Sequence, residues 1–153
     1  MTDPVPPRIA IVVSQFNPEV TDGLLKGALD HLAAQGAPVA ASDIIAAPGA
    51  YELPLIAQTL ARTGRYAGVV CLGCVIKGET AHFEFISLGA SLGLMAAGLQ
   101  TETPVSFGVL TTYTDEQAVA RSRDDAENKG REAANACLST VQTLRRIRAD
   151  ALA

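Results

Sequence analysis

The first strongly patterned stretch of the chain is Arg8-Ile-Ala-Ile-Val-Val13, a nearly continuous apolar run. Such a run is typical of a strand that is covered on both faces of a parallel sheet. Asn17-Pro-Glu19 follows, with an N-cap residue, a proline at the first helical position and an acid in the first turn. A helix is therefore expected from Pro18 to Gly36, packed on the sheet. Its apolar face carries Val20, Leu24, Leu25, Ala28, Leu29 and Leu32.

The same alternation of strand and helix continues to the end of the chain. Further strands are expected at 38–45, 66–75 and 104–110. Further helices are expected at 53–64, at 81–100, after the capping sequence Thr114-Asp-Glu-Gln117, and at 128–148. This order predicts an α/β fold in three αβα layers, with a doubly wound, four-stranded parallel sheet. Ligands of such sheets bind beyond the carboxyl ends of the strands.

Length and composition indicate one globular domain over residues 1–153, with residues 1–7 as a flexible arm. Apolar residues make up 48% of the 153 residues and charged residues 18%, so the chain can bury enough surface to fold. A net charge of −4 without a basic stripe excludes a nucleic-acid partner. The longest nearly apolar run, residues 66–76, is shorter than the ~20 residues that span a bilayer, and residues 1–7 lack the pattern of a signal peptide. A cytoplasmic protein without a membrane partner is expected.

The cysteines Cys71, Cys74 and Cys137 leave two interpretations open. Cys71-Leu-Gly-Cys74 matches the C-x-x-C pattern of thioredoxin-like redox pairs, but such pairs open a helix and this one falls in a strand-like run. Small buried hydrophobic residues are the better interpretation. The remaining candidates for zinc ligands, His31, His82 and Cys137, follow no recognised spacing, so no metal site is expected.

The loops after the predicted strands carry candidate binding residues. Neither a G-x-G-x-x-G sequence nor a Walker A sequence is present, so a dinucleotide or nucleoside triphosphate site has no support. Phe16 and Tyr51 are aromatic residues that stand among turn residues. They either stack on a planar ligand ring or close the end of the core.

A phosphate site and a proton-transfer residue are candidates near residue 80. Gly78-Glu79-Thr80 precedes a predicted helix start, where free backbone N–H groups and the helix dipole favour an anion. Arg121 and Arg123 are available as charged donors. His82 stands at the same helix start and is either a general acid and base near neutral pH or a structural histidine.

Taken together, these positions resemble the 6,7-dimethyl-8-ribityllumazine synthase family, in family order and spacing over nearly the whole chain. The matching segments are Phe16-Asn17, Leu24-Leu-Lys-Gly-Ala28, Pro48-Gly-Ala-Tyr-Glu-Leu-Pro54, Leu72-Gly-Cys-Val-Ile-Lys-Gly-Glu-Thr-Ala-His-Phe83, Phe107-Gly-Val-Leu-Thr-Thr112, Glu116-Gln-Ala118, Arg121 and Asn128-Lys-Gly130. The resemblance implies a flavodoxin-like form of the three-layer fold. It also implies an enzyme of riboflavin biosynthesis that condenses 5-amino-6-(D-ribitylamino)uracil with 3,4-dihydroxy-2-butanone 4-phosphate, releases phosphate and water, and needs no metal or redox cofactor.

The resemblance assigns roles in the ring-binding part of the site. Phe16 and Ala50-Tyr51-Glu52 match the pocket for the pyrimidine and its ribityl chain. The backbone of Cys74-Val75-Ile76 matches the groups that bind the edge of the heterocycle, and His82 matches the proton-transfer residue. Proton uptake and delivery are both needed for imine formation and phosphate elimination.

The resemblance also assigns the phosphate-binding part of the site. Glu79 and Thr80 with Arg121 match the phosphate site, and Lys129 belongs to the same field of charge. Phe107 matches a residue that covers the ring from a neighbouring subunit. A monomer is therefore expected to have an incomplete site.

The family resemblance also leads to expectations about the oligomeric state of the protein. The resemblance implies a homo-oligomer built from pentamers and a link to riboflavin synthase. Ser122-Arg-Asp-Asp-Ala-Glu127 replaces the Gly- and Lys-containing turn of capsid-forming members, and Asp125 reverses the charge of a usual lysine, so a pentamer or decamer is expected. Tyr51 replaces a frequent Phe, and Leu88-Gly89 replaces a usual Asn-Glu pair for no functional reason evident in the sequence. The alternatives are a non-catalytic relative that binds a flavin or lumazine, and a small redox domain.

Overall fold

Four parallel strands form the central sheet in the computed structural model, which describes residues 4–153. The strands are β1 (Ile9–Ser14), β2 (Ile44–Ala47), β3 (Gly68–Ile76) and β4 (Val105–Thr112). Their order across the sheet is β2-β1-β3-β4, and every neighbouring pair is parallel. β1 and β3 therefore occupy the centre, and β2 and β4 form the two edges.

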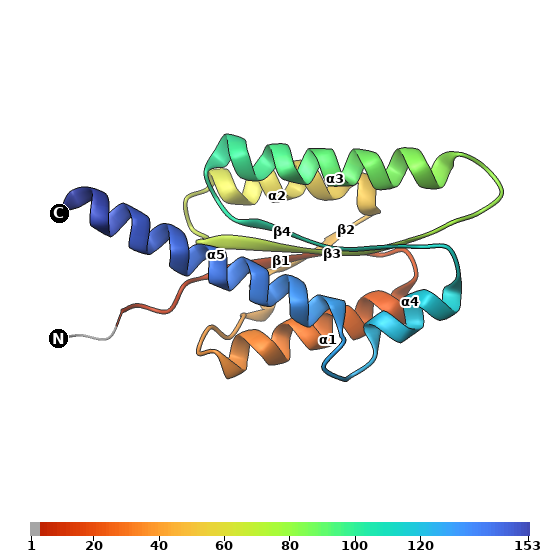
Figure 1. Ribbon diagram of the computed structural model, residues 1–153, viewed down its shortest axis with the longest axis horizontal. Helices are drawn as coiled ribbons and strands as arrows, with labels where there is room; N and C mark the ends of the chain where they lie inside the picture. Colours follow the sequence, from red (N-terminus) through yellow and green to blue (C-terminus); the bar gives the residue numbers. More distant parts are fainter. Residues whose placement is uncertain (1–3) are drawn as a thin grey trace.

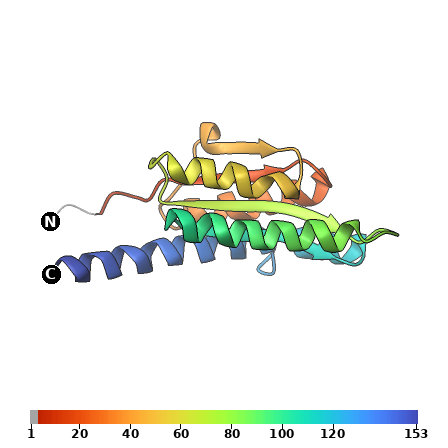
Figure 2. The ribbon, with the colours of Figure 1, turned by 90° about the horizontal axis from the view of Figure 1, so that it is seen from above.

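Helices cover both faces of the sheet, as Figures 1 and 2 show. One face carries α1 (Pro18–Ala34), α4 (Asp115–Ser122) and α5 (Lys129–Leu152). The other face carries α2 (Leu53–Arg62) and α3 (His82–Thr101). Two short 3-10 helices, η1 (Ala41–Asp43) and η2 (Ala50–Glu52), flank β2. The prediction of a three-layer, doubly wound, flavodoxin-like fold is confirmed.

The segment that precedes β1 and the C-terminal end of α5 lie at the same end of the molecule (Figure 2). Residues 4–7 belong to no helix or strand, and the Val5 carbonyl accepts a hydrogen bond from the Arg145 guanidinium at 3.3 Å. The rest of the predicted arm, residues 1–3, lies outside the described residues. Helix α5 continues past its predicted end at 148 to Leu152 and extends beyond the sheet (Figure 1).

The second strand is the element whose predicted position is wrong. The sequence predicts it at 38–45, whereas β2 occupies Ile44–Ala47 and follows η1. Strand structure begins where pairing with β1 begins, with Ile44 opposite Ile11. Asp43, the last residue of η1, is held by two hydrogen bonds from the Arg8 guanidinium, so the chain joins the sheet only after this residue.

Asn17 occupies the N-cap position of α1, as predicted, but its side chain does not cap the helix. Its backbone is left-handed, with φ of 55°, and its Nδ2 donates a hydrogen bond to the Cys74 carbonyl at 3.1 Å. The amide therefore ties the start of α1 to the end of β3. In contrast, the side chains of Thr114 and Asn128 do cap α4 and α5.

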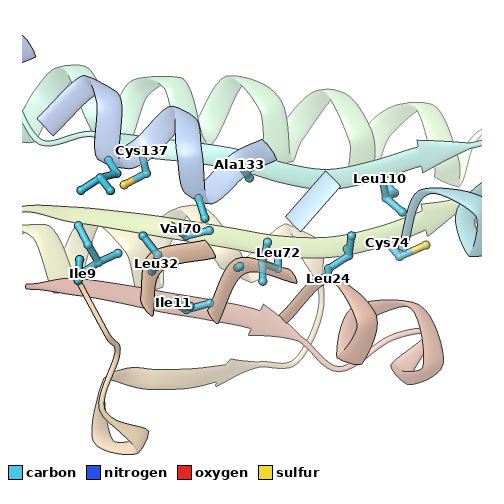
Figure 3. Packing of buried hydrophobic residues seen from close by; sticks show 14 of the residues in the cluster. Ile9, Ile11, Leu24, Leu32, Val70, Leu72, Cys74, Leu110, Ala133 and Cys137 are labelled. Atoms are coloured by element: carbon cyan, nitrogen blue, oxygen red, sulfur yellow. The ribbon is translucent and has the colours of Figure 1, made fainter. Parts of the chain in front are cut away.

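Alternate strand residues point into two separate cores, one on each face of the sheet. The first core includes Ile9, Ile11, Leu24, Leu32, Val70, Leu72 and Cys137 (Figure 3). The second includes Ala10, Val12, Leu53, Val69, Cys71 and Leu94. Burial of each Leu or Ile side chain contributes about 1.5–3 kcal/mol to folding, so both faces hold the sheet firmly in place. The strand ends therefore present the loops from a rigid platform.

Small residues let α3 pack closely on α2. A Cβ at Gly93 would lie only 2.6 Å from the ring of Pro54, and Ala90 and Ala97 are fully buried on the same side of the helix. The sequence leaves open whether this small-residue face packs within the chain or on another copy. Its partner is α2 of the same chain.

The other side of α3 is apolar and exposed. Its exposed residues recur at spacings of three and four, as in helices that pack side by side. They are Phe85, Leu88, Leu92, Met95 and Leu99. Among residues 4–153, α3 is the one helix long and apolar enough to cross a membrane by length and composition, and 17% of that segment is buried. This finding corrects the expectation that 66–76 is the longest apolar segment.

Candidate functional site

A cavity of about 380 Å³ opens beyond the carboxyl ends of β1 and β3, next to the start of α3. We call it the aromatic cavity. Most of the predicted ring-binding residues and the predicted proton-transfer residue line it together. These residues are Phe16, Ala50, Tyr51, Glu52, Cys74, Val75, Ile76 and His82. The cavity lies where ligands bind in doubly wound sheets.

Phe16 and Tyr51 contribute the two large rings of the aromatic cavity. These residues are 67% and 64% exposed, so they do not close the core. A Cβ at Gly49 would lie 3.2 Å from the Phe16 ring and from the Glu52 carboxylate, so the missing side chain lets both groups approach the loop backbone. Exposed rings beside a cavity suit stacking on a planar ligand.

The floor of the aromatic cavity is the end of β3. Residues 75–76 are half-buried, and the preceding Cys74 carbonyl accepts the hydrogen bond from Asn17. Asn17 also lines the cavity. It is absent from the predicted site residues because its position before a proline favours a helix cap. Its place directly after Phe16, at a strand end, was the available signal.

The loop between β3 and α3 carries Glu79 and Thr80 beside the helix start. Both residues are exposed, and neither lines the aromatic cavity. The Thr80 hydroxyl accepts a hydrogen bond from the backbone N–H of His82 at 3.4 Å. His82 is the first residue of α3, so its imidazole stands at the positive end of that helix and at the cavity wall.

An ion pair connects the residues on either side of this loop. The backbone N–H of Lys77 donates to the Thr112 carbonyl at 2.9 Å, and the Lys77 ammonium lies 3.3 Å from the Glu84 carboxylate. The pKa of Glu84 is lowered by its own backbone N–H and then by Lys77. Both side chains are about half exposed, so the pair adds little stability, but it joins the two ends of the loop.

A second cavity, of about 260 Å³, lies between β4, α4 and the first turns of α5. We call it the basic cavity, because Arg121 and Lys129 line it together with Phe107. Arg121 Nη1 donates to the Gln117 carbonyl at 3.0 Å, and Lys129 Nζ lies 2.6 Å from the Glu132 carboxylate. Glu132 also lines this cavity and is absent from the predicted site residues. Its spacing of three residues from Lys129 was the available signal.

The aromatic and basic cavities share no lining residue. Arg121 belongs to α4, whereas His82 begins α3 on the opposite face of the sheet (Figure 1). Within one chain, Arg121 therefore shares no cavity with Glu79 or Thr80. The structure groups the predicted ring-binding residues in one place and the predicted cationic residues with Phe107 in another.

Comparison with known proteins shows the family of the chain. The family profile described as 6,7-dimethyl-8-ribityllumazine synthase matches residues 6–145. The chain belongs to the lumazine synthase family. A Caulobacter vibrioides protein named 6,7-dimethyl-8-ribityllumazine synthase 1 is 98% identical over all 153 residues and is covered completely. Proteins named 6,7-dimethyl-8-ribityllumazine synthase from Salinibacter ruber and Edwardsiella ictaluri are 50% and 49% identical, over 86% and 93% of this chain and 84% and 92% of their own lengths.

The three cysteines of the chain are buried core residues. Cys71 and Cys74 pack in the cores on opposite faces of β3, so their side chains point apart. Burial raises the pKa of the Cys74 thiol to about 11 and that of Cys137 to about 12, and it raises the pKa of Cys71 further. A redox pair needs an accessible thiolate, so the redox alternative has no support. In the described part of the chain, no group of three or more Cys, His, Asp or Glu side chains is placed to hold a metal ion.

Proposed function

We propose that this protein condenses 5-amino-6-(D-ribitylamino)uracil with 3,4-dihydroxy-2-butanone 4-phosphate to form 6,7-dimethyl-8-ribityllumazine, releasing phosphate and water. The observation that carries the proposal is the division of the site between two cavities. An aromatic cavity with His82 suits a flat heterocycle and proton transfer. A basic cavity with Arg121 and Lys129 suits a phosphate monoester.

The pyrimidine occupies the aromatic cavity in this proposal. The exposed rings of Phe16 and Tyr51 supply apolar faces, and the backbone at the end of β3 supplies hydrogen-bonding groups for the ring edge. Glu52, on the adjacent turn, is placed to accept hydrogen bonds from ribityl hydroxyls. Asn17 fixes the strand end on which the ring rests.

The phosphorylated ketone occupies the basic cavity of a neighbouring copy. Because the two cavities of one chain share no residue, a complete site forms only where the basic cavity of one copy faces the aromatic cavity of the next. Phe107, which is 45% exposed beside Arg121, then covers the ring bound by the neighbour. Glu79 and Thr80 of that neighbour approach the same phosphate from the start of α3.

A head-to-tail contact of this kind generates a closed ring when the rotation between neighbouring copies closes on itself. We propose a homopentamer in which the exposed apolar residues of α3 are buried against other copies instead of lipid. Asp125 is exposed in the α4–α5 turn, and its negative charge favours a pentamer or decamer over a capsid. A cytoplasmic location and a link to riboflavin synthase belong to the same proposal.

Most of the acceleration comes from holding the two substrates together. The 5-amino group of the pyrimidine attacks the ketone carbonyl, and a first water leaves as the imine forms. Loss of the proton on the neighbouring carbon expels phosphate and leaves an enol, which becomes a second carbonyl. The ribitylamino nitrogen then attacks this carbonyl, and a second water leaves as the ring closes. His82 takes up and returns protons in these steps. Its contribution is modest, about 10²-fold or less, because alignment of two reactive substrates supplies the larger part.

Turnover with both substrates tests the proposed reaction. Purified protein is expected to form the lumazine chromophore much faster than buffer does. Product at the buffer rate, together with tight riboflavin binding, would instead support the non-catalytic alternative. Omission of either substrate is the control for background absorbance.

Mixed assemblies test the shared site. Phe16→Ala damages the aromatic cavity, and Arg121→Ala damages the basic cavity. When the two variants are co-refolded at equal concentration, roughly a quarter of the contacts in a ring unite two undamaged halves. Activity above that of either variant alone is expected. No gain, in assemblies shown by mass photometry to contain both variants, would place the whole site within one chain.

A further inference from the structure

The junction of α1, α4 and α5 is organised around the side chain of Asn128, which is 2% exposed. Its Nδ2 donates hydrogen bonds to the carbonyls of Gly23 at 3.0 Å, Ser122 at 3.2 Å and Arg123 at 2.8 Å. Its Oδ1 accepts a hydrogen bond from the backbone N–H of Arg131 at 3.0 Å. One buried amide therefore joins three helices through four backbone groups.

Glycines keep this junction close-packed. A Cβ at Gly27 would overlap the Asn128 amide, and a Cβ at Gly23 would overlap the Ser122 carbonyl. A Cβ at Gly130 would overlap the backbone of Leu24 in α1. Neither the amide nor the helices around it have room to shift without disturbing the others.

The junction adjoins the two cationic residues that line the basic cavity. Arg121 immediately precedes Ser122, whose carbonyl Asn128 holds, and Lys129 immediately follows Asn128. Both cations line the basic cavity, whereas Asn128 does not. The amide thus fixes the end of α4 that carries one cation and the start of α5 that carries the other.

We propose that Asn128 is a positioning residue that sets the spacing of Arg121 and Lys129 for the phosphate group. This inference rests on the proposed function, because it assigns the two cations to the phosphorylated substrate. A bidentate guanidinium and an ammonium must both reach the same anion, and a displacement of about 1 Å in such a site costs up to ~10²-fold. None of the residues that contact the Asn128 amide lines the aromatic cavity, so replacement of Asn128 is expected to change binding of the pyrimidine little.

Three variants test the proposal. Asn128→Asp keeps the shape of the side chain but loses the donated hydrogen bonds, and Asn128→Ala removes the amide. Gly27→Ala leaves Asn128 in place but adds a methyl group that displaces its amide. Thr114→Ala is the matched control, because it removes the other side-chain cap, that of α4, without reaching the junction. Folding of each variant is checked by circular dichroism, and assembly by mass photometry.

Two readouts separate positioning from a merely structural role. The KM for the phosphorylated ketone and the Kd for inorganic phosphate are expected to rise roughly tenfold or more in the junction variants. The KM for the pyrimidine is expected to stay within about twofold of wild type, as both constants do in Thr114→Ala. An equal rise in both KM values, or no change in phosphate binding, would overturn the proposal.

The outcomes also distinguish this proposal from the proposed reaction. Wild-type protein without turnover contradicts the reaction, whereas the phosphate Kd, measured by calorimetry, tests Asn128 without turnover. If Asn128→Ala does not fold, Asn128→Asp and Gly27→Ala provide the comparison. Failure of all three to fold, with Thr114→Ala intact, would make Asn128 a structural residue and overturn the proposal.

Discussion

The ring of Tyr51 lies against the backbone of Gly89. A Cβ at Gly89 would lie 3.3 Å from Cε2 and 3.5 Å from Cδ2 of Tyr51, so the absent side chain makes room for the ring. Tyr51 belongs to η2 and lines the aromatic cavity, and Gly89 lies in the second turn of α3. Tyr51 and Gly89, two of the positions expected to depart from the family pattern, are therefore in contact.

Gly89→Ala is expected to raise the stability of the protein and to weaken binding of the pyrimidine. Alanine in place of glycine within a helix adds up to ~1 kcal/mol to the free energy of unfolding, which raises Tm. The new methyl group pushes the Tyr51 ring toward the cavity, so the KM for the pyrimidine is expected to rise a few-fold. In a Tyr51→Ala background the effect of Gly89→Ala on KM should disappear, as a double-mutant cycle would measure. An undiminished effect in that background would mean that the two residues act independently.

Arg121→Ala is expected to weaken binding of the phosphorylated ketone selectively. The variant removes a charged donor from the basic cavity, so the KM for the ketone rises by about tenfold or more while the KM for the pyrimidine changes little. Steady-state kinetics with each substrate varied in turn provide the measurement. Arg123→Ala is the control, because Arg123 is exposed and does not line the cavity. Equal losses in the two variants would indicate a general effect of charge.

His82→Ala is expected to lower kcat by about 10²-fold or less, with near-normal KM values. The imidazole lines the aromatic cavity, but the stacking rings and the basic cavity remain intact in this variant. Single-turnover measurements at several pH values provide the test, because a lost general acid and base alters the pH profile as well as the rate. Complete loss of turnover, with substrate binding preserved, would mean that proton transfer outweighs alignment.

Local signals explain which elements the sequence predicts well. Pro18 fixes the start of α1, and Thr114 caps α4 as expected, because each signal acts within one helical turn. The position of β2 depends instead on pairing with β1, a distant segment. The role of Asn17 likewise depends on the carbonyl of Cys74, 57 residues away. Neither partner is visible in the local pattern.

The sequence also identifies residues of the candidate site without revealing how they are arranged in space. The family pattern identifies Phe16, His82 and Arg121 as site residues, but linear order does not reveal that Arg121 lies on the opposite layer from His82. The exposed apolar side of α3 is similarly hidden, because small residues and large ones alternate along a helix that is apolar almost all round. Three-dimensional placement separates the face of α3 that packs on α2 from the apolar face that is exposed in one chain.

The three thiols are expected to be unreactive in the folded protein. With its pKa raised to about 11, Cys74 carries very little thiolate at pH 8, and Cys71 and Cys137 are more deeply buried still. Titration with a thiol reagent should therefore show slow reaction in native buffer and three reactive groups in guanidinium. Rapid reaction of two thiols in the folded protein would instead support the redox alternative.

Asp43→Asn is expected to destabilise the protein in a pH-dependent way. The Asp43 carboxylate is 4% exposed and accepts hydrogen bonds from Arg8 at 2.8 and 2.9 Å and from the Tyr66 hydroxyl at 2.9 Å. The variant disrupts this buried network, so a loss of about 1–3 kcal/mol is expected at pH 7. Urea unfolding at fixed protomer concentration provides the measurement, because assembly contributes to stability.

The pH dependence follows from the direction of the pKa shift. Hydrogen bonds from Arg8 hold the pKa of Asp43 below its ordinary value of 3.8, so the unfolded chain takes up this proton at higher pH than the folded chain. The stabilisation is complete above pH 3.8 and fades as the pH falls through the lowered pKa. The difference between wild type and Asp43→Asn should therefore narrow in acid. Asp30→Asn, which breaks an exposed pair with Lys26, should lower the free energy of unfolding at pH 7 much less than Asp43→Asn does, because solvent screens the exposed pair. A constant gap from neutral to acid pH would show that ionisation of Asp43 is not the source of the stabilisation.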